Sequence, residues 1–244
     1  MKGVALVTGA SGGIGRAIAL RLADDGYAVA VHCYRNEHKA QEVRDEILAI
    51  GGQAEVFVCD ITDADAVDYM VNEICRSLGC VTVLVNNAGI AQQKLFTDLS
   101  VDEWQRMMAV HVDGAFYTGR AVLPDMIRAH SGSIVNVSSM WGQTGGSCEV
   151  HYSTAKAALI GLTKALAKEV GPAGIRVNCV APGVIQTEML AEFSRETLND
   201  LAEETPLCRL GTPEDVAAAV SFLVSDGAGF ITGQVLAPNG GIVI

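Results

Sequence analysis

The sequence has no long apolar run, no close cysteine pair and little positive charge. Its seven cysteines include no CxxC pair, so neither a disulfide framework nor a bound metal is expected. No apolar stretch reaches the roughly 18 residues that a membrane span requires. The opening sequence MKGVALVTGAS also lacks the basic, apolar and cleavage regions of a secretory signal. We therefore expect a cytoplasmic protein in a reducing compartment.

The scarcity of basic residues limits the possible partners. With 17 Lys and Arg against 28 Asp and Glu, the formal charge is −11. Nucleic acids and anionic membranes are not expected to bind, because a basic surface supplies most of that attraction. Half of the 244 residues are hydrophobic, which excludes a disordered chain. With no linker or repeat dividing it, residues 1–244 are expected to form one domain.

Short apolar runs alternate with amphipathic helical patterns along most of the chain. The runs are rich in β-branched residues and predict strands at 4–7, 28–31, 54–58, 81–85, 133–137 and 176–180. Helical patterns lie near 13–25, 37–50, 63–78, 100–129 and 152–170. This alternation predicts a Rossmann-type doubly wound α/β fold with about seven parallel strands and helices on both faces. A polar segment near 186–212 is expected to form a substrate lid of two short helices.

The first expected strand runs into a glycine-rich turn that opens a helix. The turn reads Thr8-Gly9-Ala10-Ser11-Gly12-Gly13-Ile14-Gly15. Glycine lets the backbone approach a pyrophosphate closely, and a helix N-terminus offers free N–H donors. A glycine cluster alone would be an ordinary strand-to-helix turn. Its place at the start of a βαβ unit favours a dinucleotide site, although the spacing is GxxxGxG rather than GxGxxG.

This turn resembles the TGxxxGxG motif of the short-chain dehydrogenase/reductase family. Other matching segments are Asn86-Asn87-Ala88-Gly89, Ser139, Tyr152-Ser153-Thr154-Ala155-Lys156, Pro182-Gly183 and Ile231-Thr232-Gly233-Gln234. The resemblance covers essentially the whole chain and implies an enzyme that reduces a ketone with a nicotinamide cofactor. The cofactor contacts it implies are Gly9, Ser11, Gly12, Gly13, Ile14, Gly15, Tyr34, Arg35, Asp60, Ile61, Asn87, Ala88, Gly89, Tyr152, Lys156, Pro182, Gly183, Ile185 and Thr187.

The catalytic residues implied by the resemblance are Ser139, Tyr152 and Lys156. Tyr152 and Lys156 lie four residues apart on an expected helix and share one face, which in isolation would suggest only a surface pair. In the family, this tyrosine protonates the substrate oxygen and the serine hydrogen-bonds it. The lysine lowers the tyrosine pKa and holds the nicotinamide ribose. Family spacing, thirteen residues before the tyrosine, selects Ser139 rather than Ser138.

One position departs from the family pattern. His111 stands where the family usually has an asparagine that supports a water-linked proton relay toward the lysine. If the relay uses mainly the backbone carbonyl, histidine can substitute; if it uses the side-chain amide, turnover should fall or gain a new pH dependence. We expect a structural role for His111. His151 either faces the substrate or is a partly exposed residue at a helix start.

The end of the second strand predicts NADP(H) as the cofactor. NAD-selective sites usually place an acid there to bind the ribose 2′-OH. Here Tyr34 holds that position and Arg35 follows, and a guanidinium can bind a 2′-phosphate with paired hydrogen bonds. Asp60, by resemblance, contacts the adenine instead.

Three functions are compatible with these motifs. The pattern looks most similar to 3-oxoacyl-[acyl-carrier-protein] reductases, although Arg120, Arg128 and Lys164 give few basic positions for an acidic carrier protein. The segments around Gln92 and Glu149 look similar to a bacterial branch that reduces a 5-aminopentanone modification on elongation factor P. The third is a dinucleotide-sensing module without catalysis, which loss of Ser139, Tyr152 or Lys156 would have indicated.

A homo-oligomer, most simply a tetramer, is also expected. The helical regions 100–129 and 152–170 are apolar on more than one face, and family members bury such faces against a symmetry mate. The side chains concerned include Leu159, Leu162, Leu166, Val122 and Met126, and the C-terminal sequence Gly241-Ile242-Val243-Ile244 is apolar as well.

Overall fold

A seven-stranded parallel sheet forms the centre of the computed structural model, which describes residues 2–190 and 193–244. The strands are β1 (Val4–Val7), β2 (Ala28–Cys33), β3 (Ala54–Val58), β4 (Val81–Asn86), β5 (Gly132–Val137), β6 (Ile175–Val180) and β7 (Val235–Leu236). Their order is β3-β2-β1-β4-β5-β6-β7, and every neighbouring pair is parallel. The doubly wound fold expected from the sequence is confirmed. The strand order reverses between β1 and β4, where such sheets bind ligands.

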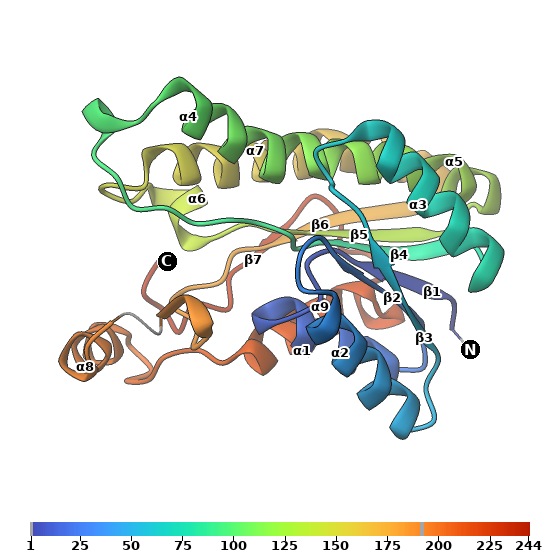
Figure 1. Ribbon diagram of the computed structural model, residues 1–244, viewed down its shortest axis with the longest axis horizontal. Helices are drawn as coiled ribbons and strands as arrows, with labels where there is room; N and C mark the ends of the chain where they lie inside the picture. Colours follow the sequence, from blue (N-terminus) through green and yellow to red (C-terminus); the bar gives the residue numbers. More distant parts are fainter. Residues whose placement is uncertain (1, 191–192) are drawn as a thin grey trace.

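Helices cover both faces of the sheet (Figure 1). One face carries α1 (Gly13–Asp24), α2 (Glu37–Ala49) and α9 (Pro213–Val224), and the other carries α3 (Ala64–Ser77), α4 (Val101–Met108), α5 (Gly114–Ala129) and α7 (Val150–Val170). Successive strand residues point to opposite faces. Ala5 and Val7 of β1 therefore belong to the core under α1 and α9, while Val4 and Leu6 belong to the core under α3 and α5.

Several elements differ from the sequence predictions. The expected helix over 100–129 is α4 and α5, joined by a π-helical turn at Ala109–Asp113. The short helix α6 (Met140–Thr144) and the whole of α9 were not predicted. The segment 186–212, predicted to form a lid, contains a 3₁₀ turn at Glu188–Leu190 and α8 (Arg195–Glu204); its residues 191–192 lie outside the described residues. Among the described residues, no helix is long and apolar enough to cross a membrane.

The apolar helix faces also need a correction. Leu159, Val122 and Met126 were expected to face a symmetry mate, but all three are buried inside the protomer. Leu162 and Leu166 are partly buried, and Leu166 packs against the same core. These side chains are explained by packing on the sheet, so they are no longer an argument for an oligomer.

Candidate active site

The residues proposed from the sequence gather along the carboxyl ends of the parallel strands. The glycine turn follows β1, Tyr34 and Arg35 follow β2, and Asp60 and Ile61 follow β3. Asn87 to Gly89 follow β4, Ser139 follows β5, and Pro182 to Thr187 follow β6. Tyr152 and Lys156 reach this edge from α7. The topology thus brings segments far apart in the sequence to one edge of the sheet.

The turn after β1 depends on close backbone contact. Gly9 has φ +65° and Gly13 has φ +51°, in the left-handed region that favours glycine. A Cβ on Gly15 would lie less than 3 Å from the Gly9 oxygen and from Asn87 Nδ2. Asn87 holds the turn from the β4 side, because its Nδ2 donates to the carbonyls of Thr8 (2.9 Å) and Gly9 (3.2 Å).

His32 is a site residue that the sequence analysis overlooked. Its Nδ1 accepts from the Gly9 N–H at 3.1 Å, so its Nε2 carries the proton and donates to the Cys59 carbonyl at 3.0 Å. The ring is fully buried, and burial lowers the pKa of His32 to about 4. A neutral imidazole therefore joins the glycine turn to the ends of β2 and β3. The sequence did offer a signal for this site residue, namely a polar residue near the end of an otherwise apolar strand.

The N-terminus of α1 is suited to an anion. Its N-cap, Gly12, makes no side-chain capping bond, and the first turn contains no acidic residue, so the free N–H donors and the helix dipole favour a negative group. A Cβ on Gly12 would meet nothing within 4 Å, whereas one on Gly13 would lie 3.5 Å from Thr187 Cγ2. The turn is open at Gly12 and bordered by the base of the lid, as a bound pyrophosphate requires.

Ser139, Tyr152 and Lys156 form one cluster. A hydrogen bond from the serine acts to lower the Tyr152 pKa, and Lys156 Nζ lies 5.5 Å from the tyrosine ring centroid. Lys156 Nζ donates to the Val137 carbonyl at 2.8 Å. The preceding serine has a different environment, because Ser138 Oγ is buried and donates to the Lys156 carbonyl at 2.7 Å.

The pKa of Tyr152 is raised, not lowered as the sequence predicts. Burial raises the pKa of Tyr152 to about 12, and the Ser139 hydrogen bond opposes that shift only partly. The lowering expected from Lys156 is absent from this arrangement, in which its ammonium contacts a backbone carbonyl. Burial also lowers the pKa of Lys156 to about 8. The tyrosine is therefore a protonated acid at neutral pH, next to a lysine that is still charged.

His111 is held by the backbone that follows β4. Its Nε2 lies 2.8 Å from the Ile90 carbonyl and 3.1 Å from the Ile90 nitrogen, and its ring stands edge-on to Tyr152 with 5.5 Å between centroids. Burial, followed by the Lys156 charge, lowers the pKa of His111 to about 3. Its Nδ1 is buried and has no partner among the described residues. The ring is neutral and packs against Tyr152.

His151 is fully buried, which corrects the alternative of a partly exposed residue. Its Nε2 lies 3.2 Å from Gln92 Oε1. Gln92 also donates to Glu103 at 2.7 Å, and Glu103 is paired with Lys94 at 2.8 Å. A polar network thus extends from the residue before Tyr152 to the start of α4.

Beside this network, Glu149 accepts from Gln93 at 3.1 Å. Its charge is one of the influences that raise the Tyr152 pKa. A carboxylate therefore lies close enough to Tyr152 to raise its pKa.

The end of β2 is exposed to solvent. The Arg35 guanidinium stacks over the Tyr34 ring at 5.3 Å, and both residues are exposed. Burial opposes ionisation of Asp60, but hydrogen bonds from Thr62, with a further one from Tyr34, keep the pKa of Asp60 below its usual range. Asp60 is thus close to Tyr34, while Arg35 has no carboxylate partner among the described residues.

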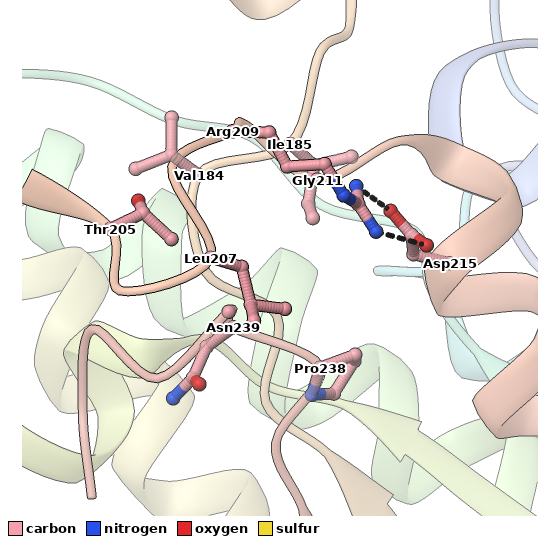
Figure 2. Close-up of a pocket in the computed structure, with 10 residues that line it drawn as sticks. Val184, Ile185, Thr205, Leu207, Arg209, Gly211, Asp215, Pro238 and Asn239 are labelled. Atoms are coloured by element: carbon pink, nitrogen blue, oxygen red, sulfur yellow. Dashed lines mark hydrogen bonds and ion pairs between the residues drawn. The ribbon is translucent and has the colours of Figure 1, made fainter. Parts of the chain in front are cut away.

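The base of the lid encloses a cavity of about 200 Å³ (Figure 2). Its wall includes Ile185, Thr205 and Asn239, and the Arg209–Asp215 ion pair at 2.6 Å lies on one side. A second cavity of about 770 Å³ lies under α8 and reaches Thr187. Neither wall contains Ser139, Tyr152 or Lys156 among the described lining residues. Ile185 is bridged to Gly211 at the other end of this segment, and Thr187 lies close to Gly13 of the glycine turn.

Comparisons with known proteins cover almost the whole chain. A family model described as enoyl-(acyl carrier protein) reductase matches residues 9–243. The chain is 41% identical over 242 residues to the uncharacterized oxidoreductase YmfI of Bacillus subtilis, covering 99% of each chain. It is 42% identical over 238 residues to the 3-oxoacyl-[acyl-carrier-protein] reductase FabG of Staphylococcus aureus, covering 98% of this chain and 97% of the relative. It is also 42% identical over 240 residues to FabG of Aquifex aeolicus, covering 98% of this chain and 96% of the relative.

Proposed function

Because the chain belongs to the short-chain dehydrogenase/reductase family of oxidoreductases, we propose that it uses NADPH to reduce a 3-oxoacyl group on acyl carrier protein. The product is the corresponding 3-hydroxyacyl group. The observation that carries the proposal is the cluster of Ser139, Tyr152 and Lys156, at the same edge of the sheet as an uncapped helix N-terminus. Loss of any of these three residues would instead have favoured a dinucleotide-sensing module.

The cluster divides the chemistry of carbonyl reduction between its side chains. When bound, the nicotinamide supplies the hydride that is added to the carbonyl carbon. The Ser139 hydroxyl donates to the substrate oxygen and fixes its position. Tyr152, whose raised pKa keeps it protonated, transfers its proton to that oxygen as negative charge develops. Lys156, whose ammonium donates to the Val137 carbonyl, would hold the nicotinamide ribose, and it would stabilise the phenolate once it turns toward Tyr152.

The preference for NADPH follows from the end of β2. The exposed Arg35 has its guanidinium over the Tyr34 ring and no carboxylate partner among the described residues, so it is available to a 2′-phosphate. The same region contains no acid positioned after β2 to accept from a ribose 2′-OH before Glu37. Asp60 lies at the end of β3 and is engaged with Thr62.

A second substrate is supported by the charges around the site. Glu149, near Tyr152, can pair with an ammonium group, as in the 5-aminopentanone modification of elongation factor P. Of the basic residues considered for carrier-protein docking, Arg120 is paired with Asp68 and Arg128 with Asp125, which reduces the positive surface offered to an acidic partner.

A substrate panel tests the proposal. Purified protein with NADPH would be assayed against acetoacetyl acyl carrier protein, a small-molecule 3-oxoacyl thioester, unrelated ketones and elongation factor P carrying the 5-aminopentanone group. We expect the highest kcat/KM for the carrier-protein thioester. A higher value for the modified elongation factor would replace that substrate with the second candidate. No carbonyl reduction in any arm, with cofactor binding retained, would favour the sensing module.

A further inference from the structure

Two cysteines and a carboxylate converge at the edge of the sheet opposite the active site. Cys75 lies in the last turn of α3, and Cys80 immediately precedes β4. The chain reverses between them because Leu78 N and Gly79 N both donate to the Ile74 carbonyl, at 2.9 and 3.2 Å. Gly79 completes the turn with φ +106°, a conformation that favours glycine. This reversal returns Cys80 to the side of Cys75.

The third group comes from α5, which packs beside α3 (Figure 1). Asp125 Oδ2 lies 3.6 Å from Cys75 Sγ, and one ligand atom from each of Cys75, Cys80 and Asp125 lies within 4.8 Å of the others. Arg128 donates to the other carboxylate oxygen, Oδ1. Such a bond to the outer oxygen is the usual way in which a metal-binding carboxylate is oriented.

These separations fit a tetrahedral metal. Zinc binds thiolate sulfur at about 2.3 Å and carboxylate oxygen at about 2.0 to 2.2 Å, which puts sulfur and oxygen roughly 3.5 Å apart in a tetrahedron. The observed 3.6 Å matches. We propose that Cys75, Cys80 and Asp125 bind Zn²⁺, with water as the fourth ligand. The sequence predicts no metal, because the cysteines are separated by four residues and the third ligand comes from a distant helix.

Metal binding would change the charge of the site. Zn²⁺ binds cysteine as thiolate, so the thiols would release their protons, and the two thiolates and the carboxylate would carry three negative charges against the two of the ion. A disulfide between the cysteines would need an added oxidant. The convergence of three ligand groups favours the metal.

The position of the proposed zinc site indicates a structural rather than a catalytic role. Cys80 lies at the amino-terminal end of β4, whereas Asn87 and the catalytic groups lie at the carboxyl ends of the strands. Bound zinc would join α3, β4 and α5, and it would stabilise the folded chain because it binds that state preferentially. Carbonyl reduction should not depend on it.

Metal titration of the full-length protein tests the proposal. Metal-free protein, kept reduced with a phosphine, would be titrated with Zn²⁺ against a chromophoric chelator and, separately, with Co²⁺. We expect one tight Zn²⁺ per chain, a thiolate-to-cobalt charge-transfer band and a higher melting temperature with zinc. Cys80→Ser and Asp125→Asn should each lose at least about tenfold in zinc affinity. Cys208→Ser, which alters another exposed cysteine, should bind as wild type does.

The same experiment can overturn the assignment. Absence of a thiolate-to-cobalt band, or equal zinc affinity in wild type and Cys80→Ser, would exclude a site at these residues. If the protein binds no zinc but forms a Cys75–Cys80 disulfide when treated with oxidised glutathione, the pair is a redox site instead. Melting curves of each metal-free variant establish that it folds before its affinity is compared.

Discussion

At the scale of single residues, the proposed mechanism depends most directly on the Tyr152 hydroxyl. It is the proposed proton donor, and its pKa of about 12 keeps it protonated at neutral pH. Tyr152→Phe should keep the fold and cofactor binding but lower kcat by at least about a hundredfold, the usual scale of general-acid catalysis. Steady-state kinetics with an identified ketone measures kcat, and fluorescence titration with the cofactor measures its binding. Near-normal kcat in the variant would exclude this role.

Arg35 should determine which cofactor is preferred. Wild type should have a higher kcat/KM with NADPH than with NADH, because the guanidinium can bind the 2′-phosphate. Arg35→Ala should lose most of that preference while its activity with NADH changes little, since the side chain is exposed and NADH has no 2′-phosphate for it to bind. A wild-type preference for NADH, or an unchanged ratio in the variant, would contradict the assignment.

His32 should make the fold sensitive to acid. Its pKa falls from 6.5 to about 4 on folding, so the unfolded chain binds the extra proton first. Stability is then complete above about pH 6.5 and declines as the pH falls toward 4. At about 1.4 kcal/mol per pKa unit, His32 should contribute a loss on the order of 2 kcal/mol at pH 5.

Urea unfolding at pH 7.5 and pH 5, at one protein concentration, measures this loss. His32→Gln should be less stable than wild type at pH 7.5 but should lose less further stability at pH 5. The remaining acid sensitivity should come partly from His111, whose pKa is also lowered by burial. Equal pH dependence in both proteins would mean that His32 is not the titrating group.

At the scale of elements, two glycines of the β1–α1 turn should have different roles. Gly15 should matter for packing and for cofactor binding, and Gly12 for cofactor binding alone. Gly15→Ala places a methyl group against the Gly9 carbonyl and Asn87, and it should lower both the melting temperature and cofactor affinity. Gly12→Ala meets no neighbour within 4 Å and has an extended backbone. It should retain the melting temperature and lose only cofactor affinity. Thermal unfolding with and without NADPH distinguishes them, and equal melting temperatures would contradict the packing argument.

Elements with a strong local pattern could be predicted from the sequence, and those shaped by distant contacts could not. Apolar runs bounded by turn residues identified six strands, because buried parallel strands need little else. The π-helical turn at Ala109–Asp113 interrupts a continuous helical pattern, and the packing of Tyr152 against His111 within it is a tertiary contact. The positions of Ser139 and Lys156 followed from family motifs. The raised pKa of Tyr152 could not be predicted, because it depends on burial, which a sequence motif does not reveal.

At the scale of the whole molecule, exposed apolar side chains on the described surface still indicate self-association. Phe230 is fully exposed, Phe222 is exposed on α9, and Leu236 is exposed on β7, the edge strand of the sheet. Phe116 on α5 and the terminal Ile244 are also exposed. We expect a homo-oligomer, most simply a tetramer, because burying such surfaces against a second copy is favourable. Sedimentation velocity at micromolar concentration checks this, and a monomer would contradict it.

The packing of α1 against α9 affects how the chain must be made. Ile18 and Leu22 are buried together with Val216, Val220 and Leu223, yet α9 begins about 190 residues after α1 ends. At 5 to 20 residues per second, a ribosome needs roughly 10 to 40 s to synthesise that interval. During this time the amino-terminal half has one apolar helix face uncovered. Chaperone binding to nascent chains should therefore begin at α1 and end only after α9 emerges.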